Sequence, residues 1–333
     1  MSDTGMNVNG GLLKRRMPVR DLPLEDFAKM LGGGPDWPDS RDLVFGVSRH
    51  GMTISAAVGG LRRMLDVPIA IEPELPRKFQ TQGIPVPGDQ GQTPWCAAYT
   101  GAYIASYLNA QEKAFKGKFT DFAESWLYHQ ARIAAGMQDP KVSGVYLRSV
   151  LQVMRKQGVM PQYAWSDFHN RPKKKYENKA LEQAANFQLQ SFASVRLNHA
   201  AIKTAIMNFG LVAVSTRVYE GWQKVGRDGR VPLPFGNNDP LGGHGVVLYG
   251  WDDDLSHHTG DDGYYFGVNW WGIDWGHNGH FYLPYGYVDR RIVYNCYSCI
   301  DKLGSKEMFE PNAWQSWLAS WPPELKKIFG IAF

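Results

Sequence analysis

The thiol of Cys96 is the side chain whose setting in this sequence first points to nucleophilic chemistry. It follows Thr93 and Pro94 closely, and we expect Thr93 to cap a helix whose first residue is Pro94. Cys96 would then lie in the first helical turn, where unpaired N–H groups and the helix dipole favour the thiolate, the form that attacks carbonyl carbons. A single cysteine in apolar surroundings is more often a small packing residue. The thiol therefore needs a partner before it predicts catalysis.

His244 and Asn269 are the candidate partners. His244 opens a run of strand-forming residues, 245–251, and Asn269 lies near the end of a second run, 264–270. The polar stretch 252–263 between the runs is typical of a hairpin loop, and its centre nearly coincides with the midpoint between His244 and Asn269. In a regular antiparallel hairpin the two side chains would lie about opposite each other. The amide oxygen would then accept the imidazole N–H and turn the other ring nitrogen towards the thiol.

Composition limits the classes of protein to which the chain can belong. It has 333 residues, of which 44% are hydrophobic and 20% charged, as in a globular protein with room for two lobes. The 36 basic and 32 acidic side chains leave a net charge of +4, so we expect no nucleic-acid partner. The sequence gives no oligomeric state.

Cysteine usage and the lack of long apolar runs bear on the compartment. Cys296 and Cys299 are far from Cys96 along the chain, so we expect no disulfide framework, and a reducing compartment fits best. No apolar run reaches the ~18 residues of a membrane span, and residues 1–20 lack the apolar centre of a secretory signal. We expect no transmembrane segment and a cytoplasmic protein, or one exported by a route without a cleaved signal peptide.

The chain divides into an N-terminal extension and two unlike halves. The extension, residues 1–71, is interrupted by glycines and carries two short amphipathic stretches with helical spacing, 24–31 and 54–65. It is either a propeptide or lid over an active site, or a structural cap or delivery segment. A mainly helical half comes next, and β-branched and aromatic runs follow after about residue 192. The expected helices are 94–109, 121–135, 145–157 and 200–208, and the expected strands are 211–218, 245–251 and 264–270.

The motifs around the candidate residues resemble those of the papain-like cysteine proteases, in particular the shorter bacterial members. The resemblance covers about residues 72–295, and the motifs together are highly specific. They are Asp89-Gln90-Gly91 shortly before Cys96, Gly242-Gly243-His244-Gly245, and Asn269-Trp270-Trp271-Gly272.

This resemblance implies an α+β fold of the papain type. A helical lobe at about residues 88–191 and an antiparallel β-barrel-like lobe at about 192–300 would enclose the active-site cleft. The protease domain would span residues 72–300, and a Trp-rich C-terminal tail, 301–333, would pack on it. No metal or organic cofactor is implied, and the partner would be a peptide or protein substrate.

The resemblance also implies roles for single residues. Cys96 would be the nucleophile, His244 the general base and acid, and Asn269 the residue that orients the imidazole. Gln90 would donate its amide N–H to the oxyanion. Trp271 would cover the histidine and asparagine pair and keep water from it. The implied function is that of a cysteine endopeptidase, which hydrolyses peptide bonds through an acyl-enzyme intermediate.

Two positions depart from the family pattern, and other readings stay open. Ala97 follows the nucleophile where tryptophan is usual, and Trp270 stands where the usual Asn-Ser-Trp-Gly has serine. The same triad could instead transfer the acyl group to an amine, or the chain could be a non-catalytic effector on a protease scaffold. Two pairs of residues also have the spacing of zinc ligands, but one cysteine pair is weak evidence and we expect no metal site. These pairs are Cys296 with Cys299 and His277 with His280.

Overall fold

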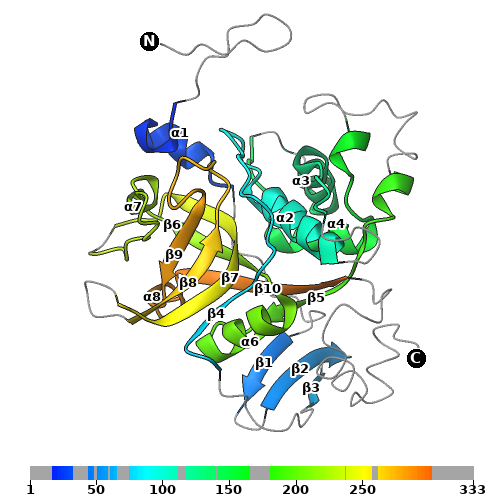
Figure 1. Cartoon of the computed structure of the whole chain (residues 1–333). Helices are drawn as coiled ribbons and strands as arrows, with labels where there is room; N and C mark the ends of the chain where they lie inside the picture. The colour runs from blue at the N-terminus through cyan, green and yellow to red at the C-terminus, as the bar shows by residue number, and fades with distance from the viewer. Residues whose placement is uncertain are drawn as a thin grey trace, which may run out of the picture.

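The protein consists of a group of helices packed against one face of a curved sheet, and the sheet has ten strands in the described residues (Figure 1). Among these residues, no helix is both long and apolar enough to cross a membrane. The expected C-terminal tail, residues 301–333, lies outside them except for Asp301. The computed structural model describes residues 17–32, 44–48, 51–58, 61–65, 75–111, 118–137, 139, 141–165, 181–236, 238–256 and 262–301.

The helical lobe is built around α2 (Cys96–Gln111), α3 (Glu124–Ala134) and α4 (Leu147–Lys156), and the short 3-10 helix η2 (Gln162–Ala164) follows them. Helix α2 is central, and almost every one of its residues is buried. Its many alanines let α3 and α4 approach closely, because a small side chain keeps neighbouring backbones near each other. The three helices expected in this half are confirmed, although α2 begins two residues later than Pro94.

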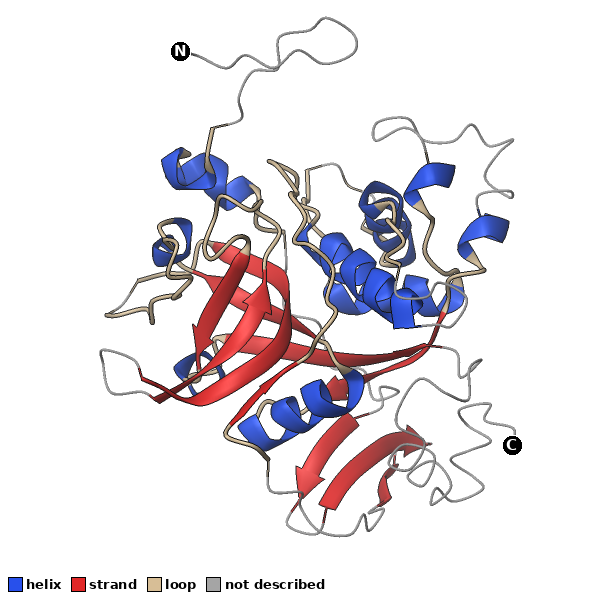
Figure 2. Cartoon of the chain, viewed as in Figure 1, coloured by secondary structure: helices blue, strands red, loops and turns tan. Residues whose placement is uncertain are grey.

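The β lobe is built around the long strand β7, which pairs antiparallel with β6 and β8. The sheet order is β3-β2-β1-β5-β10-β6-β7-β8-β9, and β4 pairs with β7 outside this path. The sheet curls without closing, so the barrel-like description fits only roughly, while the expected α+β class is confirmed (Figure 2). The strands of this lobe are β4 (Lys78–Gln80), β5 (Leu189–Val195), β6 (Val212–Val218), β7 (Gly242–Ser256), β8 (Asp262–Val268), β9 (His280–Pro284) and β10 (Val293–Asp301). Its helices are α6 (His199–Phe209), α7 (Glu220–Gln223) and α8 (Gly286–Asp289).

The N-terminal extension supplies elements at two distant places. A short 3-10 helix, η1 (Val19–Asp21), and helix α1 (Leu24–Lys29) come first, so the first amphipathic stretch is helical as expected. The second stretch is not a helix. Residues 51–58 and 61–65 form an antiparallel pair of strands, and β1 next to them adds parallel to β5. A short apolar run can fit helical spacing by chance, and pairing with a sheet edge overrides it. The strands are β1 (Val44–Ser48), β2 (Gly51–Val58) and β3 (Leu61–Leu65).

Strand β7 separates two hydrophobic cores. Val246 and Leu248 pack in the core of the β lobe. Val247 and Tyr249 point the other way, into the core that contains α2. Side chains alternate in this way along any strand, so β7 forms the wall between the lobes. His244 lies on the β-lobe face of this wall, two residues before Val246.

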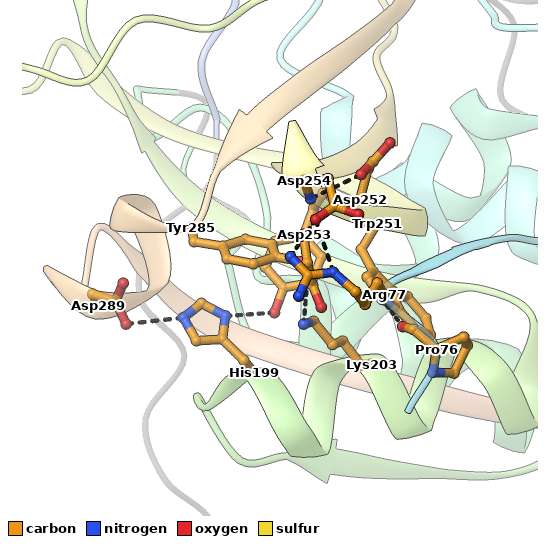
Figure 3. A network of polar contacts seen from close by, with 11 residues as sticks. Pro76, Arg77, His199, Lys203, Trp251, Asp252, Asp253, Asp254, Tyr285 and Asp289 are labelled. Carbon is orange, nitrogen blue, oxygen red and sulfur yellow. Dashed lines mark hydrogen bonds and ion pairs between the residues drawn. The ribbon is translucent and has the colours of Figure 1, made fainter. Parts of the chain in front are cut away.

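A polar network fixes helix α6 to the outer part of the β lobe (Figure 3). Lys203 donates to Asp253 Oδ1 at 2.5 Å, and its ammonium lies 4.8 Å from the centre of the Tyr285 ring. The Tyr285 hydroxyl donates to the same carboxylate oxygen. His199, at the start of α6, bonds Asp289 Oδ1 at 3.0 Å. The Lys203 side chain is only 10% exposed, so these partners take the place of water around its ammonium group.

Replacing Lys203 with methionine tests how much this network contributes to the free energy of unfolding. The variant keeps the aliphatic stem and removes the charge, so Asp253 loses a buried donor, and we expect the free energy of unfolding to fall by about 1–3 kcal/mol. Urea denaturation measures the change. Lys224→Met is the control, because it breaks an exposed pair with Glu220 one helical turn away and should cost about 0.5 kcal/mol or less. Equal losses in both variants would contradict the assignment.

Candidate active site

Cys96 is the first residue of α2 and is fully buried. The expected cap is not formed, because the Thr93 hydroxyl donates to the Gln90 carbonyl at 2.6 Å and does not accept from a helix N–H. In return, Gln90 Nε2 donates to the Thr93 carbonyl at 2.7 Å. This tight turn leads the chain into α2 and fixes the side chain of Gln90.

The thiol of Cys96 is surrounded by backbone donors. The N–H groups of Gly245, Gly32 and Ala97 point at its sulfur, and each stabilises the thiolate. Burial opposes them and is the larger effect, so the pKa of the thiol is raised above its usual value. In the structure as it stands, Cys96 is therefore a neutral thiol at neutral pH.

His244 is buried and is held by Asn269. Its Nε2 lies 2.7 Å from Asn269 Oδ1. Because an amide oxygen can only accept, Nε2 carries the proton and Nδ1 has a free lone pair. Nδ1 has no hydrogen-bond partner among the described residues. Burial lowers the pKa of His244 to about 4, against a smaller opposing effect of the bond to Asn269.

The register between β7 and β8 differs from the expected one. Val247 pairs with Val268, and continuing this register would set His244 opposite Trp271. His244 and Asn269, which were expected to lie about opposite each other, are therefore offset by two residues in the pairing. Asn269 lies just beyond β8, where the chain leaves the strand, and its side chain still reaches the imidazole. The Val247–Val268 pair centres the hairpin on the middle of its loop, whereas the midpoint between His244 and Asn269 lies one residue earlier, and one residue at the centre is two positions in the pairing.

Aromatic rings cover the imidazole. Trp271 is stacked on His244 with ring centres 4.8 Å apart and an angle of 28° between the planes. Trp222 meets the same ring edge-on at 6.2 Å. Both indoles are almost fully buried, so the histidine and its bond to Asn269 lie in surroundings of low polarity. This enclosure is the physical cause of the lowered pKa of His244.

Gln90 is buried and bonds to two segments that are distant from it in the sequence. It is 2% exposed, and its backbone N–H donates to the Trp270 carbonyl at 2.7 Å. Its side-chain Nε2 donates to the carbonyl of Met30 at 3.0 Å. A peptide carbonyl from elsewhere in the chain thus accepts the amide N–H that would stabilise an oxyanion.

Residues 30–32 of the N-terminal extension lie across the candidate site. Leu31 packs on the β lobe, since a Cβ atom added to Gly242 would come within 2.8 Å of the Leu31 Cβ. Gly32 packs on the helical lobe, since a Cβ atom on it would come within 2.7 Å of the Gly144 Cα. The segment therefore contacts both lobes beside the candidate nucleophile.

The preceding residues anchor this segment to the β lobe. Phe27 is fully buried, and its ring meets Trp271 edge-on at 5.0 Å. Gln223 Nε2 donates to the carbonyls of Val19 and Leu22, at 3.0 and 2.6 Å. Figure 1 shows α1 at the end of the β lobe, next to the start of α2. No spacing rule assigns a short amphipathic helix to a particular surface, so sequence reasoning left its position open.

The residues with zinc-ligand spacing do not form a site. Cys296 belongs to the core of the β lobe and Cys299 to the core that contains α2, because residues three apart on a strand point to opposite faces. His277 and His280 pair with each other across a tight turn. No group of three or more metal-binding side chains is present in the described part of the chain.

Comparison with known proteins agrees with this geometry. The papain family cysteine protease model matches residues 88–298. An uncharacterised peptidase C1-like protein of Acanthamoeba polyphaga mimivirus is 26% identical over 212 residues, which are 60% of this chain. That alignment covers 64% of the length of the viral protein.

Several solved structures share the fold. Xylellain, a cysteine protease from Xylella fastidiosa, superposes with a TM-score of 0.62 over 87% of this chain and 99% of its own, at 20% identity. Procathepsin B S9 from Trypanosoma congolense gives a TM-score of 0.55 over 84% and 89% of the two chains, at 14% identity. With the family match over most of the chain, these likenesses identify the protein as a member of the papain family of cysteine proteases.

Proposed function

We propose that this protein is a cysteine endopeptidase whose triad is Cys96, His244 and Asn269. The observation that carries the proposal is the 2.7 Å bond from His244 to Asn269, made where the strand after His244 touches the Cys96 thiol. That bond fixes the tautomer that a general base needs, with its free lone pair on Nδ1. Membership of the papain family supports hydrolysis of peptide bonds.

The proposed reaction is acyl transfer to water. His244 Nδ1 takes the Cys96 proton, and the thiolate attacks the carbonyl carbon of a peptide bond. The carbonyl oxygen gains negative charge and accepts the N–H of Gln90 Nε2. The C–N bond then breaks as the imidazolium returns its proton to the leaving amine. Water, deprotonated by the same imidazole, cleaves the thioester and regenerates the thiol.

We further propose that residues 17–32 keep this site latent. Met30 supplies the carbonyl that occupies Gln90, and the Gly32 N–H contacts the Cys96 thiol. Both reacting groups are neutral in these dry surroundings, because burial raises the pKa of the thiol and lowers the pKa of His244 to about 4. The segment thus blocks the site and also suppresses the ion pair that would attack it. The related fold of procathepsin B S9, a proform, is consistent with this reading.

This proposal divides the N-terminal extension into two parts. Residues 17–32 would act as the lid, whereas β1, β2 and β3 belong to the sheet next to β5. Removing all of residues 1–71 would therefore also strip the sheet of three strands. A substitution that lifts only residues 30–32 is the sharper test.

Variants of the triad test the proposed chemistry. Cys96→Ala and His244→Ala should each lower kcat/KM for a peptide substrate by about a thousandfold or more. Asn269→Ala should lower it by about ten- to a hundredfold, because orienting the ring contributes less than the nucleophile or the base. Because the lid covers the site, the assays use both the full chain and the full chain carrying Gly32→Val. Cys299→Ala, which removes another buried thiol, is the control. Activity that survives Cys96→Ala would overturn the triad.

Gly32→Val tests the lid. The added side chain would collide with Gly144 and Pro94, whose atoms lie 2.7 Å from the new Cβ, so residues 30–32 should lift. Water then reaches the Cys96 thiol, which relieves the burial that raises its pKa. Peptide hydrolysis should increase about tenfold or more, and alkylation of Cys96 by iodoacetamide should begin at lower pH. Mass spectrometry locates the adduct.

Gly226→Val is the matched control for the lid variant. A Cβ atom there has only Asp228 Oδ1 within reach, at an ordinary 3.6 Å, so the fold should tolerate the same substitution. Activity and alkylation should then equal those of the unchanged protein. If Gly32→Val behaved like Gly226→Val, the lid proposal would be wrong while the triad could still hold.

A further inference from the structure

Trp270 occupies the space between the two lobes, directly behind the candidate triad. It is fully buried, and it stands where the resembled family motif has serine. Its ring lies 5.0 Å from Tyr103 and 6.2 Å from Tyr99, both on α2. A large flat side chain therefore fills a place between the helix that begins with Cys96 and the strand that carries His244.

The indole N–H joins these two elements. It donates to the carbonyl of Gly245, the residue after His244, at 2.8 Å. The same N–H lies 3.2 Å from Thr100 Oγ1, and that hydroxyl donates to the carbonyl of Cys96 at 3.0 Å. One side chain thus connects the peptide next to the imidazole with the first turn of the helix that carries the thiol.

The backbone of Trp270 contacts the other two candidate residues. Its N–H donates to Asn269 Oδ1 at 2.8 Å, so this oxygen accepts from both Trp270 and His244. Its carbonyl accepts the backbone N–H of Gln90 at 2.7 Å. A shift of Trp270 would therefore move the asparagine and the glutamine together.

The close contact at Gly245 explains why a side chain that links α2 to β7 matters for the candidate site. A Cβ atom on Gly245 would lie 3.2 Å from the Ala97 Cα, so strand and helix already touch through their backbones. The Gly245 N–H points at the Cys96 sulfur, and its carbonyl accepts from the indole. Sliding of β7 along α2 would change the approach of imidazole to thiol, and the indole bond resists that movement.

We propose that Trp270 is a positioning residue, whose indole N–H bond to Gly245 sets the separation between Cys96 and His244. This inference rests on the proposed triad. Trp270 does not touch the reacting atoms itself. It acts through the strand that carries the base and through the first turn of the helix that carries the nucleophile.

Trp270→Phe tests the proposal, because it keeps an aromatic ring and removes the N–H. We expect kcat to fall by about ten- to a hundredfold with KM changed less than about twofold, since small displacements of reacting groups have effects of this size. A poorly placed imidazole stabilises the thiolate less, so the acidic limb of the kcat/KM profile should move to higher pH. Assays use the full chain with and without Gly32→Val.

Trp251→Phe is the matched control. Trp251 is equally buried, and its indole N–H donates to a backbone carbonyl, that of Pro76, at 2.9 Å. Its bond lies outside the candidate site, beside the network of Figure 3. Both variants should lose similar thermal stability, and Trp251→Phe should keep the parent kcat and pH profile. Equal kinetics in the two variants would overturn the positioning role.

Thr100→Val supplies a second test, and its single-variant measurement does not depend on the tryptophan variant folding. It removes the hydroxyl between Cys96 and Trp270 and keeps the shape of the side chain. We expect a smaller fall in kcat, with the pH limb moved in the same direction, and a double variant whose loss is less than the product of the two single losses. If the loss in the double variant equalled the product of the two single losses, Thr100 and Trp270 would act independently, and the proposed common link between α2 and β7 would be contradicted. Failure of the triad itself would appear separately, as activity that survives Cys96→Ala.

Discussion

The first turn of helix α2 lies against the backbone of strand β7 at Gly245, and the candidate site depends on this contact. Because Cys96 precedes Ala97 and His244 precedes Gly245, bringing these two backbones together also brings a thiol and an imidazole together from distant parts of the chain. Glycine favours this approach, since a Cβ atom on Gly245 would lie 3.2 Å from the Ala97 Cα, closer than most Cβ contacts, and would push strand and helix slightly apart. The alternation of β7 between two cores holds the strand in this position from both faces.

Burial at this contact governs the protonation of both groups. Water would stabilise a thiolate and an imidazolium, and the described structure keeps water from both. Aromatic rings cover His244 from one side, and residues 30–32 cover the thiol from the other. The same low polarity makes each hydrogen bond in the site matter more, including the bonds made by Trp270. Burial is thus the common physical basis of the two proposals, the latency of the site and the positioning role of Trp270.

Much of the secondary structure could be predicted because its signals are local. The expected helices 121–135, 145–157 and 200–208 correspond to α3, α4 and α6, and β-branched and aromatic runs identified β6, β7 and β8. The stretch 54–65 was mistaken for a helix because its apolar spacing fits both periods, and pairing along the sheet edge decided for strands. The register at Asn269 was off by two residues because the middle of the loop and the midpoint between His244 and Asn269 differ by one residue, and the pairing doubles that difference.

By itself, the sequence determined which residue types are present, in what order, and on which kind of element, and its motifs were enough to indicate the family. Tertiary structure alone decided that Met30 reaches Gln90, that Gly32 contacts the Cys96 thiol, and that Trp270 ties α2 to β7. These contacts join segments that are far apart along the chain. They exist only because the two lobes pack at one angle and one distance, and no local periodicity encodes that packing.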